Sequence, residues 1–240
     1  MLINSNILNL SYNRSVMQEY TINMKILIYI LFLFSLSINA YAFDEDCINS
    51  KQFPFCLYKD SKIDFIILRD EKEVGWHKVA FEKTNDGFKV ETTAYIKARY
   101  LLFLDYVFEY SSISNWVNNQ LINQEVLIDD DGNKYNINIT NISDDLLEIT
   151  DEDKNTVTIS NKNIIPSDHW HPFEIKYNNM INTLNGEVLS TKISKVDNNT
   201  WFVDGKVKYY INYDDDGRWT GLKFNPDEDT VIEYVCISCN

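Results

Sequence analysis

Hydrophobic and polar residues alternate along most of the chain after Lys62, and turn signals interrupt the alternation at short intervals. A period of two puts every second side chain on the same face, which is typical of half-buried β-strands. Asp-Gly and Asn-Gly pairs mark most of the turns, and we expect a positive φ angle at each of their glycines. These turns are expected at residues 85–87, 131–132, 185–186, 204–205 and 216–217.

The alternation predicts strands that are joined mostly as antiparallel hairpins. They cover residues 63–68, 74–82, 88–96, 126–128, 134–140, 187–196, 201–203, 206–213, 218–224 and 230–235. The best helix candidate, residues 111–122, lacks a sustained apolar stripe and is rich in asparagine, a poor helix former. We therefore expect an all-β protein. Its fold would be a single curved antiparallel sheet, or a partly closed barrel or β-roll, of about twelve strands with little helix beyond a signal peptide.

The densest apolar segment, Tyr100–Tyr110, does not alternate strictly. This pattern favours a central strand covered on both faces, or a strand that lines a cavity. Asp105 and Glu109 interrupt the segment, and Lys97 and Arg99 precede it. We interpret the two carboxylates as solvated or salt-bridged residues rather than as the acid/base pair of a glycosidase.

The N-terminal part has the pattern of an export signal. From Met24 the chain continues with a single Lys25, an apolar run from Ile26 to Leu36 and a small-x-small end at Ala42. We expect cleavage after Ala42, because the run is shorter than the roughly 18 residues that span a bilayer. The mature protein would then be periplasmic or secreted, without a stable membrane span. The expected organisation is a disordered gene-start extension at 1–23, a signal peptide at 24–42, a Cys-containing segment at 43–62 and a single all-β domain at 63–240.

The formal net charge of −14 limits the range of partners. Binding to nucleic-acid phosphates requires clustered Lys and Arg, so we expect no nucleic-acid partner. Anionic membrane surfaces should also repel so acidic a chain.

Cys47, Cys56, Cys236 and Cys239 are the four cysteines of the chain. In an exported protein they are disulfide candidates with three possible connectivities. If the last strand continued through Cys236 and Cys239, their Cα atoms would lie about 10 Å apart, beyond disulfide reach. Either the strand turns there, or these cysteines join the C-terminal segment to the N-terminal one. A four-cysteine zinc site and a thioredoxin-like redox pair are the alternatives.

Two of the three histidines, His169 and His171, lie in the stretch IIPSDHWHPF. In a regular strand both would project from one face, where they could bind a metal together. Asp168 or the remote His77 could complete a zinc site or a His/Asp acid–base site. Asp168, His169 and His171 are therefore the catalytic candidates, and His77, His169 and His171 are the metal candidates.

Pro166 and Pro172 bracket that stretch and favour a short turn over a strand. The interpretation we prefer is a structural corner, or the rim of an apolar ligand site, with Trp170 as a plug over the core. Because aromatic residues also concentrate in the densest apolar segment, the binding candidates are Trp170, Tyr100, Phe103 and Tyr106.

Other signatures of activity are missing from the sequence. The two Asp-Asp-Asp-Gly segments place glycine at the wrong position for an EF-hand calcium loop. There is no phosphate-binding glycine loop, no Gly-x-Ser-x-Gly elbow and no His-Glu-x-x-His motif. We expect no cofactor, and the pattern favours a non-enzymatic protein.

The order of turn and aromatic landmarks resembles a family of exported bacterial proteins, domain of unknown function family 6134. The landmarks are Val74-Gly75-Trp76-His77, Trp116 with Leu121, Asp131-Gly132, Pro166-Ser167-x-x-Trp170, Leu184-Asn185-Gly186 and Tyr213-x-x-x-Gly217-x-Trp219. The resemblance covers residues 63–234. It implies an all-β secreted or periplasmic protein without an assigned activity, and it identifies no catalytic residue.

The function that we expect is a periplasmic binding or carrier-type module. Its partner would be an apolar small molecule or lipid, or an envelope component. The alternatives are a metal- or His/Asp-dependent hydrolase and a non-catalytic scaffold that contacts envelope proteins.

Overall fold

The computed structural model describes Phe43, residues 45–100 and residues 104–240. The expected signal peptide and Phe103 lie outside the described residues. The helical elements are α2 (Glu45–Ile48) and the 3-10 helix η1 (Pro172–Lys176). The strands are β1 (Lys62–Arg69), β2 (Lys72–Lys83), β3 (Phe88–Tyr100), β4 (Leu104–Val117), β5 (Gln120–Asp130), β6 (Asn133–Ser143), β7 (Leu146–Thr150), β8 (Thr156–Ser160), β9 (Ile164–Pro166), β10 (Asn179–Ile181), β11 (Val188–Ser190), β12 (Lys192–Lys195), β13 (Thr200–Asp204), β14 (Tyr209–Tyr213), β15 (Trp219–Phe224) and β16 (Ile232–Ser238).

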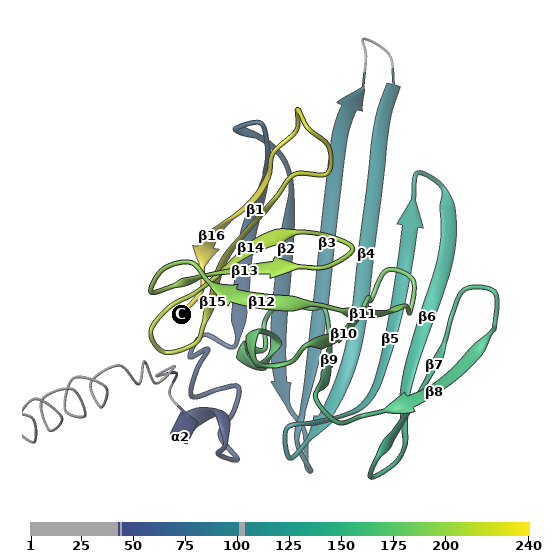
Figure 1. Ribbon diagram of the computed structural model, residues 1–240, viewed down its shortest axis with the longest axis vertical. Coiled ribbons are helices and arrows are strands. Elements are labelled where there is room, and N and C mark those ends of the chain that lie inside the picture. Colours follow the sequence, from purple (N-terminus) through teal and green to yellow (C-terminus); the bar gives the residue numbers. More distant parts are fainter. Residues whose placement is uncertain (1–42, 44, 101–103) are drawn as a thin grey trace, which may run out of the picture. The chain divides into compact units, whose positions relative to one another are not determined.

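Thirteen of these strands form one antiparallel sheet with the order β12-β13-β14-β15-β16-β1-β2-β3-β4-β5-β6-β7-β8. The sheet is open, with β12 and β8 at its edges (Figure 1). The other three strands form a small sheet, in which β10 pairs with β9 in parallel and with β11 in antiparallel orientation. The expected all-β class is confirmed. No helix in the described residues is long and apolar enough to cross a membrane.

The large sheet curls around the segment that contains β9, η1 and β10, which we call the inner segment (residues 164–191). Asp168 of this segment accepts a hydrogen bond from Gln124 in β5, and Glu174 accepts one from Tyr209 in β14. β5 and β14 are seven steps apart in the sheet order, which would be roughly 34 Å in a flat sheet. A seven-residue stretch of chain can bond to both strands only because the sheet curves around it.

The core lies between the inner face of the large sheet and the inner segment. Trp170 is 1% exposed and packs its ring against Phe53, Phe81 and Trp116. The inner face follows the expected alternation, as in β2, where every second residue from Gly75 is buried. The expected role of Trp170 as a plug over the core agrees with this packing.

The apolar density of the segment Tyr100–Tyr110 predicted a single strand, and this prediction is wrong. Tyr100 ends β3 and pairs with Leu104, the first residue of β4, so the segment contains the end of one strand and the start of the next. A continuous apolar run does not distinguish a single strand from the two arms of a turn that contains no Gly or Pro. Asp105 lies on the exposed surface of β4 and forms ion pairs with Arg99 and Lys97, at 2.9 and 3.2 Å.

The strand expected over residues 187–196 is divided between the two sheets. β11 belongs to the small sheet and β12 to the large one. Thr191, which lies between them, donates its backbone N–H to the carbonyl oxygen of Asn178 at 2.8 Å. The chain changes sheets at this residue without a glycine or proline to mark the change.

Three of the expected turn glycines, Gly132, Gly186 and Gly217, have φ angles of +90°, +76° and +95°. The expectation was wrong for Gly87 and Gly205, which do not have a positive φ. Gly87 is needed for a different reason, because a Cβ atom there would lie 1.9 Å from the carbonyl oxygen of Trp116.

The turn between β4 and β5 was not anticipated at all. Asn118 and Asn119 form it with φ angles of 51° and 62°. Asparagine tolerates this left-handed conformation better than most residues, so an Asn-Asn pair can replace the more familiar Asn-Gly turn.

The four cysteines form two local disulfides, and the expected disulfide bonding is confirmed. Cys47 bonds to Cys56 with a Cα–Cα distance of 5.8 Å, and Cys236 bonds to Cys239 at 6.2 Å. β16 ends at Ser238, so the chain turns and brings the last two cysteines together. The alternative in which they join the N-terminal segment is therefore wrong, and neither pair is left free to form a zinc site.

Candidate functional site

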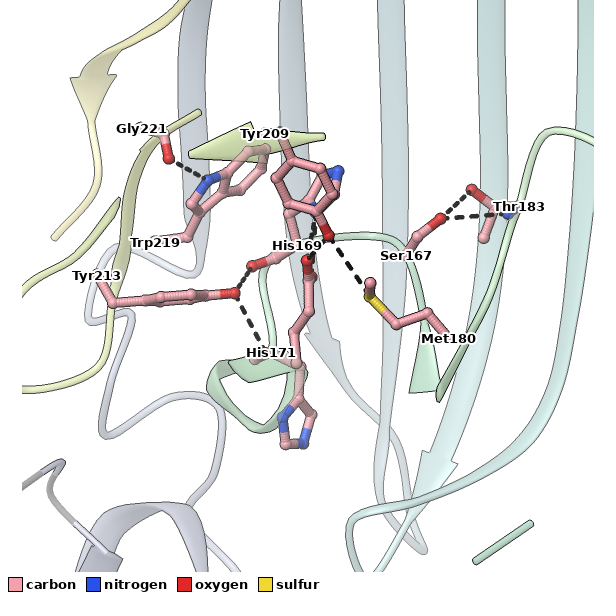
Figure 2. Close-up of polar contacts among 10 residues, drawn as sticks. Ser167, His169, His171, Met180, Thr183, Tyr209, Tyr213, Trp219 and Gly221 are labelled. Atoms are coloured by element: carbon pink, nitrogen blue, oxygen red, sulfur yellow. Dashed lines mark hydrogen bonds and ion pairs between the residues drawn. The ribbon is translucent and has the colours of Figure 1, made fainter. Parts of the chain in front are cut away.

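The inner segment turns sharply where the sequence places two histidines. His169 has a φ angle of 66°, and His171 begins η1 as its N-cap. His169 and His171 therefore do not occupy alternate positions of a regular strand. The sequence-based prediction that both side chains project from one face depended on such a strand. Figure 2 shows the imidazole of His169 directed toward Tyr209 and that of His171 directed away from it.

His169 pairs with a buried carboxylate. Its Nδ1 atom lies 2.9 and 3.0 Å from the two carboxylate oxygens of Glu174, which is 1% exposed. The hydroxyl of Tyr209 donates a hydrogen bond to the same carboxylate at 2.7 Å. Burial alone would lower the pKa of His169, but the charge and hydrogen bond of Glu174 raise it above its usual value. Glu174 therefore favours the protonated form of the His169 imidazole in the interior.

Asp168 forms its hydrogen bonds with β4 and β5, far along the large sheet from the strand β14 that contacts Glu174. Its carboxylate accepts hydrogen bonds from the amide of Gln124 at 2.8 Å and from the hydroxyl of Tyr110 at 3.1 Å. Burial raises the pKa of Asp168 to about 6, although both hydrogen bonds act in the opposite direction. At neutral pH this side chain is a buried carboxylate held by neutral donors.

His171 has the surroundings of a core residue. Its ring centroid lies 4.9 Å from that of Phe53 and 5.7 Å from that of Trp116. Its Nδ1 atom accepts the backbone N–H of Phe173 at 3.1 Å, which caps η1. Burial lowers the pKa of His171 to about 3, so the ring is neutral. These contacts position the corner and do not involve His169.

No group of three or more His, Cys, Asp or Glu side chains in the described part of the chain is arranged to hold a metal ion. Of the three metal candidates, His77 and His169 face a common cavity, whereas His171 does not. A site that uses both His169 and His171 is therefore not assembled.

The cavity lies between the inner face of the large sheet and the inner segment, and its volume is about 380 Å³. β2, β3 and β4 supply one wall, β14, β15 and β16 another, and the inner segment closes the third side. Its apolar lining consists of Ile96, Phe108, Met180, Leu189, Leu222 and Phe224, with four tyrosines at 106, 110, 209 and 234. This volume and lining are typical of small-molecule sites, which occupy roughly 300–1,000 Å³.

The register of the strands explains why the sheet leaves this space. Ala94 of β3 pairs with His77 of β2 on one side and with Tyr110 of β4 on the other. All three are buried on the inner face. The single methyl group of Ala94 between two larger side chains leaves a hollow that the inner segment covers without filling.

Three buried polar atoms in this lining have no hydrogen-bond partner in the described structure. They are Nε2 of His77 and the hydroxyl oxygens of Thr92 and Thr191. Only two further atoms of this kind occur in the described residues, so unpartnered groups concentrate at the cavity. Each such group costs about 1–3 kcal/mol when it stays unpaired, which suggests a partner that is not part of the chain.

Burial, with a smaller effect of the charge on His169, lowers the pKa of His77 to about 3. Its imidazole is therefore neutral at physiological pH and offers one donor and one acceptor. The sequence indicated His77 only as a metal candidate. It gave no signal for Thr92 or Thr191, because threonines on strands are common and their positions depend on the curl of the sheet.

The candidate binding residues are divided between the cavity and the core. Tyr106 lines the cavity, whereas Trp170 lies in the core beside Phe53 and Phe81. Tyr100 is the last residue of β3, and the placement of its side chain lies outside the described part of the chain, as does Phe103.

The fold has a solved counterpart. The structure is similar to a crystal structure of a β-barrel-like protein of domain of unknown function DUF1849 from Brucella abortus, with a TM-score of 0.51 and 9% sequence identity. The match covers 74% of this chain and 95% of that chain. At this identity the likeness shows the fold alone. No curated protein matches the sequence.

The sequence also matches the family model described as Domain of unknown function (DUF6134) over residues 65–237. The matched range begins in β1 and ends in β16, so it includes every strand that lines the cavity. The chain therefore belongs to the DUF6134 family.

Proposed function

We propose that this protein is an exported binding or carrier-type module that holds an apolar small molecule or lipid in the cavity between its curled sheet and its inner segment. The observation that carries the proposal is the concentration of residues with unpartnered buried polar atoms in the lining of a largely apolar cavity. A ligand with an apolar body and a polar end would satisfy both kinds of lining.

Two features of the chain support the proposal that the protein is exported. Two disulfides are typical of proteins that fold in an oxidising compartment, outside the cytoplasm. Residues 24–42 have the pattern of a cleaved signal peptide. Both features support a mature protein that acts in the periplasm or outside the cell.

A His/Asp-dependent hydrolase has less support from the geometry. His169 is held by Glu174, and Asp168 is held by Gln124 and Tyr110, so neither side chain orients the other. The hydroxyl of Ser167 lies 3.5 Å from that of Thr183 and is not bonded to a histidine.

The proposal is tested by titrating the mature protein with N-phenyl-1-naphthylamine, an uncharged apolar dye that fluoresces when it leaves water. We expect saturable binding at one site per chain. Ala94→Phe should weaken the binding at least tenfold, because the new ring occupies the hollow beside His77 and Tyr110.

Ala80→Phe is the matched control, because Ala80 lies on β2 with its side chain exposed. It makes the same change of side chain on the outer face and should leave the dye affinity within about twofold of the wild type. Absence of saturable binding to the wild-type protein, or equal binding by both variants, would refute the proposed function.

A further inference from the structure

We propose that the ligand is an uncharged, single-chain amphiphile whose hydroxyl or amide head hydrogen-bonds to His77 and Thr92. This inference rests on the proposed function and specifies the chemistry of the ligand at the same cavity. It concerns which head group the cavity accepts and how long a tail it can cover.

The head-group site is formed by side chains that can both donate and accept. His77 on β2 and Thr92 on β3 are diagonal neighbours on the inner face, because Ala94 pairs with His77 and Thr92 pairs with Val79. Thr191 also lines the cavity, but it lies beside Gly205 and Val207 and so belongs to the mouth. A hydroxyl or amide head, which also donates and accepts, can pair with both His77 and Thr92.

The charges around the cavity disfavour an anionic head. Lys206 at the lining is paired with Glu187 at 2.5 Å, and His169 is paired with Glu174. Asp168 is the remaining charged group in the described lining, and its partners are the neutral Gln124 and Tyr110. The lining therefore carries one uncompensated negative charge at neutral pH, and a carboxylate or phosphate head placed beside it would be repelled.

A cationic head is also disfavoured. The three unpartnered groups are neutral, and the carboxylate of Asp168 already accepts two hydrogen bonds. An ammonium group would have to leave water for an apolar space with one partly satisfied carboxylate as its partner. Burying a charge without a full set of partners costs more than burying a hydroxyl that is hydrogen-bonded.

The tail must be short and single. A volume of about 380 Å³ lies near the lower end of the range of small-molecule sites, which is too small for a lipid with two acyl chains. Leu184 and Val207 line the cavity and are 44% and 50% exposed, which marks them as residues of its mouth. The apolar tail would run from the buried head group toward this apolar rim.

The test uses four ten-carbon competitors that differ only in the head: 1-decanol, decanoate, decylamine and 1-chlorodecane. Each displaces N-phenyl-1-naphthylamine from the mature protein at pH 7.5. We expect 1-decanol to bind at least tenfold more tightly than decanoate or decylamine. We also expect it to bind several-fold more tightly than 1-chlorodecane, which cannot donate a hydrogen bond.

Two variants locate the head group. Thr92→Val keeps the shape of the side chain and removes its hydroxyl, and His77→Phe removes both ring nitrogens. In each variant the ratio of the 1-decanol affinity to the 1-chlorodecane affinity should fall roughly three- to tenfold, the size of one lost hydrogen bond. Because the ratio is measured within one variant, a general loss of stability does not change it, and circular dichroism confirms that each variant is folded.

The failures of the two proposals are distinguishable. If the wild-type protein does not bind the dye, the proposed function fails. If the dye binds but decanoate or decylamine displaces it as well as 1-decanol does, or if neither variant changes the ratio, the cavity is a binding site and this head-group inference is overturned.

Discussion

Asp168 and His169 are consecutive residues, yet they bond to strands that lie seven steps apart in the large sheet. The carboxylate of Asp168 accepts a hydrogen bond from the amide of Gln124 in β5. The carbonyl oxygen of His169 accepts one from the hydroxyl of Tyr213 in β14 at 2.7 Å, which Figure 2 shows. Two consecutive residues of the inner segment therefore connect strands from two distant parts of the curled sheet.

Asp168→Asn should stabilise the protein in a pH-dependent way. Burial raises the pKa of Asp168 to about 6, above the usual value near 3.8 in the unfolded chain. The protonated form is favoured in the folded state, so stability is lost as pH rises from about 4 through about 6. At pH 7.5 Asp168→Asn should exceed the wild type by about 2–3 kcal/mol, from roughly 1.4 kcal/mol per pKa unit.

Urea unfolding at pH 4 and pH 7.5 measures this difference. The asparagine amide can keep both hydrogen bonds, with its oxygen accepting from Gln124 and its nitrogen donating to Tyr110. The advantage of the variant should therefore be small at pH 4 and grow with pH. An advantage of equal size at both pH values would show that the carboxylate charge is not the cause.

His77→Phe should stabilise the ligand-free protein while it weakens recognition of the head group. Nε2 of His77 is buried without a partner, so its replacement removes an unpaired polar group, which is worth about 1–2 kcal/mol. The pKa of His77 is lowered to about 3 by burial, so the folded state resists its protonation and loses stability as pH falls below about 6.5. The variant should also unfold less readily between pH 6.5 and pH 4.

Protein refolded from urea, so that no ligand is carried over, is suited to this comparison. Unfolding midpoints of the wild type and the variant at pH 7.5 and pH 4.5 measure both effects. A variant that is less stable than the wild type at both pH values would contradict the unpartnered state of His77.

Tyr58→Phe should destabilise the fold strongly although it removes one oxygen atom. The Tyr58 hydroxyl donates to the carbonyl oxygen of Trp170 at 2.7 Å and accepts the backbone N–H of Trp219 at 3.0 Å. Its removal leaves two buried backbone groups unpaired, which costs about 2–4 kcal/mol. Tyr210→Phe is the control, because Tyr210 is 44% exposed, and it should change stability by less than about 0.5 kcal/mol. Equal effects of the two substitutions would refute the bridging role.

The two disulfides should contribute unequally to stability. Cys47–Cys56 closes a loop with a sequence separation of 9, and Cys236–Cys239 closes one of 3. Loop entropy predicts a loss of about 2–3 kcal/mol when Cys47 and Cys56 are both replaced by serine, and about 1 kcal/mol less for the other pair. Urea unfolding of the two double variants measures the order, and the reverse order would contradict an entropic account.

The class of the fold could be predicted because it depends on local signals. Alternation identified most strands, and Gly132 and Gly217 marked turns by a conformation that glycine adopts readily. The N-terminal end of β4 was missed because no Gly or Pro separates Tyr100, the end of β3, from Leu104, the start of β4. The strand change at Thr191 was missed because it depends on a hydrogen bond to Asn178, a residue of another segment.

The candidate site could be predicted only in part. The sequence drew attention to Asp168 and His169, which do line the cavity. It could not show that His171 turns into the core, because that depends on the positive φ of His169. No local sequence pattern marks Thr92 as a cavity residue. It lines the cavity because the large sheet curls and brings distant strands around the inner segment.

The most direct measurement is a crystal structure of the mature protein with 10-bromo-1-decanol, in which anomalous scattering locates the bromine. We expect the hydroxyl oxygen within hydrogen-bond distance of His77 Nε2 or the Thr92 hydroxyl, and the bromine near the mouth at Leu184 and Val207. A cavity without bromine density, or a ligand with its hydroxyl at the mouth and its bromine against His77, would contradict the proposed site.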